Sequence, residues 1–600
     1  FICCCSSIIM NDSDQSRLVF FAIKFIIITL TPFDRPLDFV RNWWLNVNDE
    51  LKSHIREALL RGILFKEDYV TNMASKAICT LALIDQIDFF PTIEKIVYLV
   101  HNEDKQYNSE QFQLSALFTL NEIIAPPYYG TLAQQNIPPI KEMISKINHR
   151  MLELFVTSFS TKSLPYREKL AMVINTLIMY ASPLYTNTEI VNVIINTVSG
   201  LIRQENCSLG LYETFCQILY NLTLANYDET AFPFESINGI ILDQIMIQQS
   251  LDKLSIAIQF YFQLAKFEYR LLQDALQFNQ LVNVNVGNKY QIKPFETEIK
   301  PRIITKIQRP RISKNLTKIL VSNENLVNRL LTILTFIDPS HTYAERNEEP
   351  ESAHKYSTNC LLYFFRLNPR AIFQYVCLFW TNYYQKYNDK GNPNYDILLD
   401  QNLPWTIKHA LLLTVSIISS TIDNYELLNP DFCEKSNFEL MSTILGSFEY
   451  DPSIFNDIKS FLMQPSIIPS YSIYYNFVLK AINAPIPRIV DTALYTVKII
   501  QKSEMIGVYD TEIEIDGCRT SFEYLIRSFQ TIISSTEYDE VIFKRMLYAL
   551  TAFFDKDSLD EKMILPFQNE ILGIIQMGLD PPGNSYEIYD LTIRVLDCFI

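Results

Sequence analysis

The sequence predicts an all-α fold, an α-α superhelix in which pairs of helices stack along one axis. A short apolar helical pattern recurs along the whole chain, with its first two copies about 40 residues apart and several later gaps of roughly 42 residues or a multiple of that. Only 13 of the 600 residues are glycine, whereas the turns of α/β enzymes depend on glycine. The chain is 48% hydrophobic, which is typical of an ordered protein.

The repeated unit is a helix–turn–helix. Apolar residues from Leu51 to Ile63 fall on one helical face, a charged turn follows, and a second apolar face with small residues comes next. Pro91 then opens the helix of the following unit. Units of about 40–47 residues are typical of HEAT-repeat and armadillo-like solenoids, and they predict about a dozen units here. The copies of the second-helix pattern are Ala74–Ala82, Leu114–Leu120, Ser255–Phe260, His409–Val415 and Asp491–Val497.

A break in the helical pattern divides the chain. We expect an N-terminal arch of repeats over residues 1–282, an irregular basic segment over 283–315, and a second arch over 316–600. The middle segment mixes prolines with lysines and arginines and shows no helical period. We interpret it as a solvated insertion, with a nucleic-acid patch or a localisation signal as the alternatives.

An apolar run at residues 18–30 has two interpretations. Its 13 residues, with Lys24 in the middle, are too few to span a bilayer, so we expect no membrane insertion. The run is either a signal-peptide core or a buried repeat helix. Because the chain starts at Phe1 and stops inside an apolar helix at Ile600, we also expect one or both ends to be truncated.

Composition and motifs argue against several classes of function. A net charge of −16 and a pI near 5.0 disfavour direct nucleic-acid binding and suit basic partners, although ordinary solubility explains them equally well. Eleven cysteines without a CxxC pair fit a reducing, intracellular compartment. The sequence contains no P-loop, GxSxG, GxGxxG or HExxH motif, so we predict that the chain is not an enzyme and needs no metal or cofactor.

The N-terminal third contains Trp44-Leu45, then the basic helix Glu50–Leu60, then Ala74–Ile78 and Phe90-Pro91. This order resembles the pattern of the importin-β branch of the karyopherins, a family that often has Trp-Pro at the last position. In that frame Ala22–Lys24 belongs to the second helix of the first repeat. The resemblance therefore favours a repeat helix for the apolar run.

Later landmarks follow the order of the family. Leu254–Leu264 resembles its sixth repeat, and Trp405–Ala410 resembles the start of a later second helix. Asp491–Val497 and Arg545–Leu550 resemble two further second helices, with tyrosines where the family has tryptophan. The chain departs from the family in two ways: it has a long basic insertion, and its acidic loop contains fewer acidic residues.

The resemblance implies a nuclear import receptor that moves between cytoplasm and nucleus and is enriched at the nuclear pore. Such a receptor holds basic cargo or the adaptor importin-α on its concave face. It docks Phe-Gly nucleoporins on its convex face and releases cargo when the GTPase Ran binds in its GTP form. Neither nucleic acid nor a membrane is an expected partner.

The same resemblance assigns cargo or importin-α contacts to Tyr495, Tyr548, Trp405 and Asp491. The two tyrosines would receive lysine or arginine by cation–π contact, worth about 0.5–2 kcal/mol each. Packing between helices is the alternative for both rings.

The remaining assignments concern Ran, Phe-Gly docking and the acidic loop. Lys76, on the second helix of the second repeat, is the candidate for Ran. Ile240 and Ile241, on a helix that would be outer, are the candidates for Phe-Gly docking, with buried packing as the alternative. The acidic loop, which is otherwise a plain solvated loop, comprises Glu345, Glu348, Glu349 and Glu351.

Two rival interpretations stay open. The first is another karyopherin, transportin-like or exportin-like, which would share the fold and Ran binding but not the importin-α cargo. The second is a HEAT-repeat scaffold of vesicle-coat or phosphatase-regulatory type, which predicts no binding to Ran.

Overall fold

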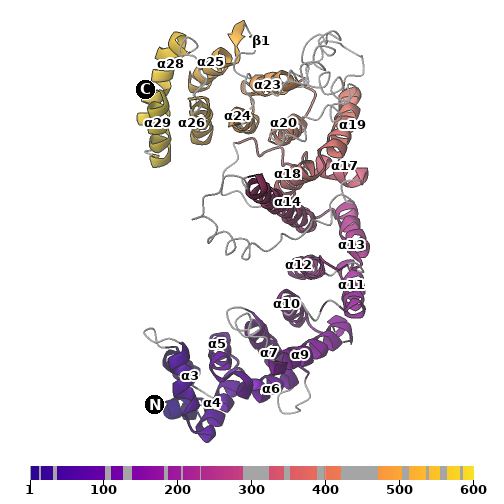
Figure 1. Ribbon diagram of the computed structural model, residues 1–600, viewed down its shortest axis with the longest axis vertical. Helices are drawn as coiled ribbons and strands as arrows, with labels where there is room; N and C mark the ends of the chain where they lie inside the picture. The colour runs from indigo at the N-terminus through magenta and orange to yellow at the C-terminus, as the bar shows by residue number, and fades with distance from the viewer. Residues whose placement is uncertain are drawn as a thin grey trace. The chain divides into compact units, whose positions relative to one another are not determined.

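The computed structural model is built of helices, as the sequence predicts (Figure 1). Its contacts divide the chain into two compact units, Phe1–Asp243 and Gln244–Ile600. Each unit is described by itself. The residues that the structure describes are 2–11, 15–31, 37–101, 110–125, 138–157, 159–180, 185, 187–204, 207–229, 232–287, 323–343, 352–387, 398, 400–420, 470–502, 512–515, 517–534, 539–554, 564–580 and 585–599.

The first unit consists of helix pairs whose members lie in two layers. The second helices, α2, α5, α7, α10 and α12, pack against one another in chain order. The first helices are α1 (Ile2–Asn11), α4 (Asp49–Gly62), α6 (Phe90–His101), α9 (Pro138–Thr157) and α11 (Thr188–Ile202); the second helices are α2 (Ser16–Leu30), α5 (Asp68–Asp85), α7 (Glu110–Ile124), α10 (Leu164–Tyr180) and α12 (Leu209–Ala225). Shorter or bordering elements are α3 (Leu37–Leu45), η1 (Gln86–Phe89), η3 (Phe159–Thr161) and α13 (Phe234–Ile247).

The second unit repeats this plan. Its second helices α14, α18, α20, α24, α26 and α29 pack in that order, and Figure 1 shows α24, α26 and α29 in one row with α23, α25 and α28 in the other. The first helices are α17 (Glu324–Ile333), α19 (Pro369–Tyr387), α23 (Ser470–Ala481), α25 (Ser521–Ser534) and α28 (Gln568–Leu579), the last preceded by η8 (Leu565–Phe567). The second helices are α14 (Leu251–Gly287), α18 (Ala353–Leu367), α20 (Trp405–Ser419), α24 (Pro487–Lys502), α26 (Glu540–Phe554) and α29 (Tyr586–Phe599).

Small residues on the second helices allow the close packing that the sequence predicts. Ala74 and Ala77 of α5 are fully buried. A Cβ atom added at Gly62 of α4 would lie 2.9 Å from the Cβ of Ala74, so the packing of these two helices leaves no room for a side chain at residue 62. Ser75 of α5 and Thr119 of α7 share a buried hydrogen bond of 2.8 Å, which links successive second helices.

The apolar run at residues 18–30 forms most of α2, which packs on α1, α4 and α5 as a repeat helix does. In the part of the chain that the structure describes, no helix combines the length and the apolar character needed to traverse a bilayer.

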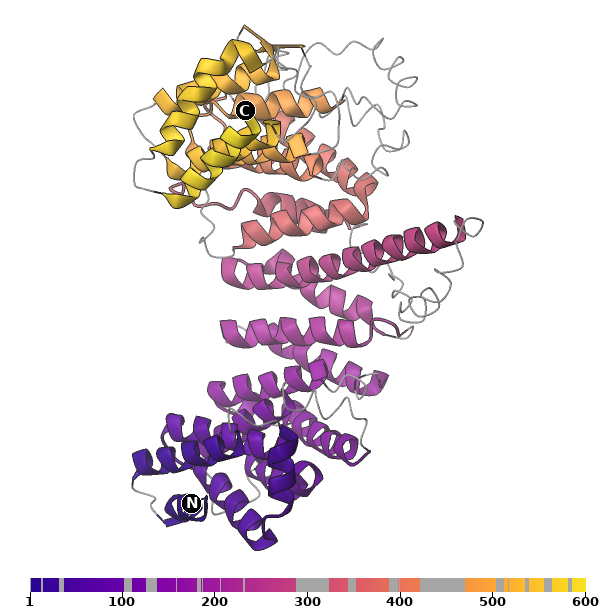
Figure 2. The same cartoon turned by 60° about the vertical axis from the view of Figure 1, so that its left-hand side comes forward.

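Two features differ from the sequence-based expectations. The long helix α14, magenta in Figure 2, continues through Gly287, so residues 283–287 are helical, and the compact units meet at residue 243 instead of 282. The remainder of the basic segment, residues 288–315, lies outside the described residues.

A β-hairpin also interrupts the helical pattern. Strands β1 (Glu512–Ile515) and β2 (Cys518–Thr520) pair antiparallel, and Gly517 in their turn has φ of 74°. The alternating Glu-Ile-Glu-Ile followed by Asp-Gly is a local hairpin signal with a period of two, which the helical period does not predict.

A buried carboxylate joins α3, α4 and α5. Asp85 at the end of α5 accepts a hydrogen bond of 2.7 Å from the indole Nε1 of Trp44 and one of 2.5 Å from Nε of Arg56 on α4. The Trp44 side chain is buried, so the packing of α3, α4 and α5 depends on this one carboxylate.

We predict that Asp85→Ala destabilises the first unit by about 2–4 kcal/mol, because a buried indole N–H and a partly buried guanidinium lose their acceptor. Glu57→Ala is the matched control, since the Lys95–Glu57 ion pair is more than half exposed and such pairs contribute about 0–1 kcal/mol. Thermal unfolding, together with hydrogen exchange over α3–α5, measures the loss of stability caused by each substitution. Equal effects of the two substitutions would contradict the role of Asp85.

Candidate partner-binding surfaces

The two tyrosines that the resemblance singles out lie on adjacent second helices of the second unit, and each already meets a cation of the chain. Tyr495 of α24 is 43% exposed, and Tyr548 of α26 is half-buried. Lys498 Nζ lies 4.0 Å from the ring centroid of Tyr548, and Arg545 Cζ lies 5.2 Å from that of Tyr495. Both rings therefore make cation–π contacts, as predicted, but the cations belong to the chain itself and not to a partner.

Asp491 has a structural role in this surface. Its side chain is buried and accepts a hydrogen bond of 2.8 Å from Nε of Arg545 across the α24–α26 interface. The expectation that Asp491 offers a carboxylate to cargo is therefore corrected, because a buried carboxylate requires a partner in the folded chain. Its contribution is to hold Arg545 beside Tyr495.

Trp405, at the first position of α20, also engages the chain itself. It is half-buried, and its indole Nε1 donates to the carbonyl oxygen of Pro339 at 3.2 Å. Its ring lies edge-on to His409, with centroids 6.1 Å apart. His409 Nε2 lies 2.9 Å from Thr492 Oγ1 of α24, so Trp405 is connected through one histidine to the helix that carries Tyr495.

Sequence reasoning missed a buried pair of histidines beside this surface. His354 of α18 and His409 of α20 stack with centroids 5.6 Å apart, although 55 residues of sequence separate them. Burial, with a smaller contribution from the Arg488 guanidinium, lowers the pKa of His354 to about 3. Burial, followed by the charges of His354 and Arg488, also lowers the pKa of His409. Both rings are neutral in the folded protein at pH 7.

Because of these two buried histidines, we predict that the second unit loses stability in acid. Their folded-state pKa values lie below the unfolded value of about 6.5, so unfolding takes up protons in acid. Stability is then lost as pH falls from about 6.5 towards 3, by up to about 1.4 kcal/mol per pH unit for each ring. Thermal unfolding of His354→Gln should lose less between pH 7 and pH 4.5 than the wild type does.

His149→Gln is the control for this prediction, because His149 lies exposed on α9. It should retain the pH dependence of the wild type. If His354→Gln and the wild type lose the same stability over this range, the buried pair is not the origin of the acid sensitivity.

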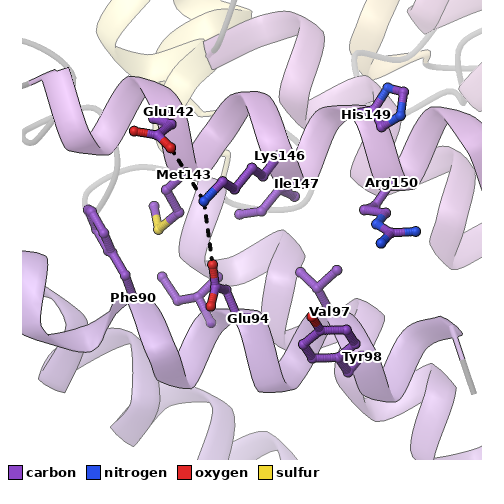
Figure 3. A pocket seen from close by; sticks show the side chains of 11 residues that line it. Phe90, Glu94, Val97, Tyr98, Glu142, Met143, Lys146, Ile147, His149 and Arg150 are labelled. Atoms are coloured by element: carbon purple, nitrogen blue, oxygen red, sulfur yellow. Dashed lines mark ion pairs between the residues drawn. The ribbon is translucent and has the colours of Figure 1, made fainter. Parts of the chain in front are cut away.

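A second candidate surface is a groove between α6 and α9, two successive first helices of the first unit (Figure 3). Its volume is about 390 Å³. Lys146 stands at its rim between Glu94 and Glu142, with N–O distances of 3.7 Å and 3.4 Å. The apolar lining is formed by Phe90, Ile93, Val97, Tyr98, Met143 and Ile147.

The predicted Phe-Gly docking residues do not lie in such a groove. Ile240 and Ile241 of α13 are 5% and 0% exposed, so their side chains belong to the core and offer no surface; this corrects the expectation. The α6–α9 groove was missed, yet Phe90, Val97 and Tyr98 have the spacing of one helical face. Helical spacing identifies a face but does not say which neighbouring helix leaves it open.

A third surface is an apolar stripe on α2, the second helix of the first pair. Its side chains are between 40% and 52% exposed and share one helical face. Lys76, the predicted Ran contact, is exposed on α5, which packs against α2. The stripe comprises Leu18, Phe21, Phe25 and Ile28.

The predicted acidic loop cannot be placed on any of these surfaces. Glu345, Glu348, Glu349 and Glu351 all lie outside the described residues.

Stacked pairs of helices in two layers define the chain as a HEAT-type solenoid. Solved structures with this arrangement include importin beta, with a TM-score of 0.64 at 12% sequence identity, covering 100% of this chain and 57% of that chain. A Kap95:Nup1 complex matches with a TM-score of 0.64 at 12% sequence identity, and the match covers 99% of this chain and 62% of that chain. Kap95p bound to RanGDP matches with a TM-score of 0.60 at 12% sequence identity, and the match covers 99% of this chain and 61% of that chain.

These likenesses confirm the karyopherin-like fold that the resemblance implies. The chain spans less than two thirds of the length of these three proteins. No protein-family model matches the sequence, and no curated protein sequence matches it.

Proposed function

We propose that the chain is a nuclear transport receptor of importin-β type, working between cytoplasm and nucleus without catalysing a reaction. It binds basic cargo or importin-α, docks Phe-Gly nucleoporins, and releases cargo when Ran binds in its GTP form. The observation that carries this proposal is the karyopherin-like solenoid with Tyr495 and Tyr548 on adjacent second helices. The net charge of −16 suits a basic partner.

For the GTPase we propose the α2 stripe together with Lys76. Second helices of the first repeats are the surface that the family resemblance assigns to Ran, and Kap95p, whose fold this chain shares, is described in complex with RanGDP. Exposed apolar side chains of this number on one helix mark a site of protein interaction.

Capture on immobilised Ran tests this assignment. We expect the chain to bind Ran loaded with a non-hydrolysable GTP analogue and to bind GDP-loaded Ran more weakly. Phe21→Asp should weaken binding at least tenfold, because it replaces apolar burial worth about 1.5–3 kcal/mol by a carboxylate. The control Leu572→Asp, at an exposed position of α28, should bind as the wild type does.

Absence of capture in either nucleotide state would contradict the receptor proposal and favour the vesicle-coat or phosphatase-scaffold alternative. Retained Ran binding with no affinity for importin-α would favour a transportin-like or exportin-like receptor.

For Phe-Gly repeats we propose the α6–α9 groove, since it combines an apolar lining with the size to admit an aromatic side chain. Kap95, which shares the fold, is described in a complex with Nup1. The groove lies between first helices, the layer that the resemblance assigns to nucleoporins.

Val97→Asp should weaken the binding of a Phe-Gly repeat peptide about tenfold, because it places a carboxylate in the apolar lining. Val193→Asp is the matched control, because Val193 is an exposed valine of α11 that does not line the groove. Fluorescence anisotropy with a labelled peptide measures both affinities. Equal weakening by the two variants would place Phe-Gly docking elsewhere.

A further inference from the structure

The rings of Tyr495 and Tyr548 differ in the kind of cation that the chain places beside them: a lysine ammonium at Tyr548 and an arginine guanidinium at Tyr495. We propose that Lys498 is an intramolecular competitor at Tyr548, which an arginine of the basic partner displaces, whereas Arg545 stays permanently beside Tyr495. The inference rests on the proposed function, since it concerns a basic partner on α24 and α26. It assigns the arginine-receiving position to one of the two tyrosines.

The contact at Tyr548 is of a kind that can exchange. Lys498 reaches the ring from the neighbouring helix α24, with its ammonium 4.0 Å from the ring centroid. A lysine ammonium is compact, strongly hydrated and carried on a flexible stem. A guanidinium is less strongly hydrated and stacks on aromatic faces, so an arriving arginine loses less hydration than the departing lysine regains.

The contact at Tyr495 is of the opposite kind. Arg545 lies beside this ring and is held by the 2.8 Å hydrogen bond from its Nε to the buried carboxylate of Asp491. The Asp491 side chain is only 4% exposed, so moving Arg545 away would leave a buried charge without its partner. A guest cation therefore gains nothing by displacing Arg545.

Acidic side chains on the same helix row, about two turns before Tyr548 on α26, favour the approach of a strongly basic segment. Glu540 of α26 and Glu587 of α29 are about half exposed and pair with Lys544, at 3.1 Å and 2.7 Å. They add long-range attraction for the guest without contacting Tyr548. The partner class that fits this surface is an arginine-rich segment, with one arginine placed on Tyr548.

The test is a double-mutant cycle in the full chain, with fluorescein-labelled deca-arginine as the probe and anisotropy at fixed salt as the readout. Lys498→Gln should strengthen binding about 2- to 30-fold, the range that corresponds to one cation–π contact. Because Lys498→Gln also removes a repelling charge, the cycle includes Tyr548→Leu and the double variant. The gain should disappear when the ring is absent.

Each outcome decides between the assignments. If Lys498→Gln still increases the affinity in the Tyr548→Leu background, the increase is due to charge alone, and the proposed exchange of Lys498 for an arginine is wrong. Unchanged or weaker binding by Lys498→Gln would also contradict the exchange. If the wild type binds deca-arginine but Lys498→Gln does not differ from it, only the exchange fails. If no variant binds, the cargo surface on α24 and α26 fails as well. Thermal unfolding of every variant shows that each compared protein is folded.

Discussion

Close contact between successive second helices is the constraint on which each unit depends. One helix pair of this chain cannot bury its apolar faces alone, so every pair relies on its neighbours for a core. The hydroxyl hydrogen bond of 2.8 Å between Ser75 of α5 and Thr119 of α7 shows how closely these helices approach. The surfaces available to partners are what this packing leaves open at its edges.

Polar contacts between neighbouring repeats set the register of that packing. The Trp44–Asp85, Ser75–Thr119 and Asp491–Arg545 contacts join residues 41, 44 and 54 positions apart, about one repeat length plus local loops. Apolar packing alone tolerates sliding of one helix along another, whereas a buried hydrogen bond has one geometry. This explains why several polar residues that look available for partners in the sequence are occupied in the structure.

The sequence predicted the fold to the extent that periodicity determines it. Repeats of about 40 residues with small residues on second helices predicted paired helices in layers. The family resemblance, not the period, put Tyr495 and Tyr548 on two second helices. The sequence did not predict that Asp491 is buried, because the reason is Arg545 on the next second helix. Ile240 and Ile241 were misassigned for a related reason, since helical spacing does not distinguish a core face from an open groove.

The hairpin at residues 512–520 and the stacked histidines are two further features that the helical period did not predict. The first is local in the sequence, and the second joins distant residues. The hairpin is encoded locally by alternating residues with a period of two, which is not part of the 3.6-residue helical pattern that predicts the repeats. The histidine pair exists only because α18 and α20 pack side by side, and neither residue carries a local signal.

The α24–α26 interface uses the same chemistry for cohesion that a basic partner would use for binding. Arg545 joins the two helices through Asp491 and Tyr495, and Lys498 joins them through Tyr548. A guest that takes over the second contact must loosen one bond between the helices while leaving the first intact. Binding on this face is therefore coupled to the packing of α24 on α26. Because solenoid contacts are local, a change in that packing is passed to the neighbouring repeats.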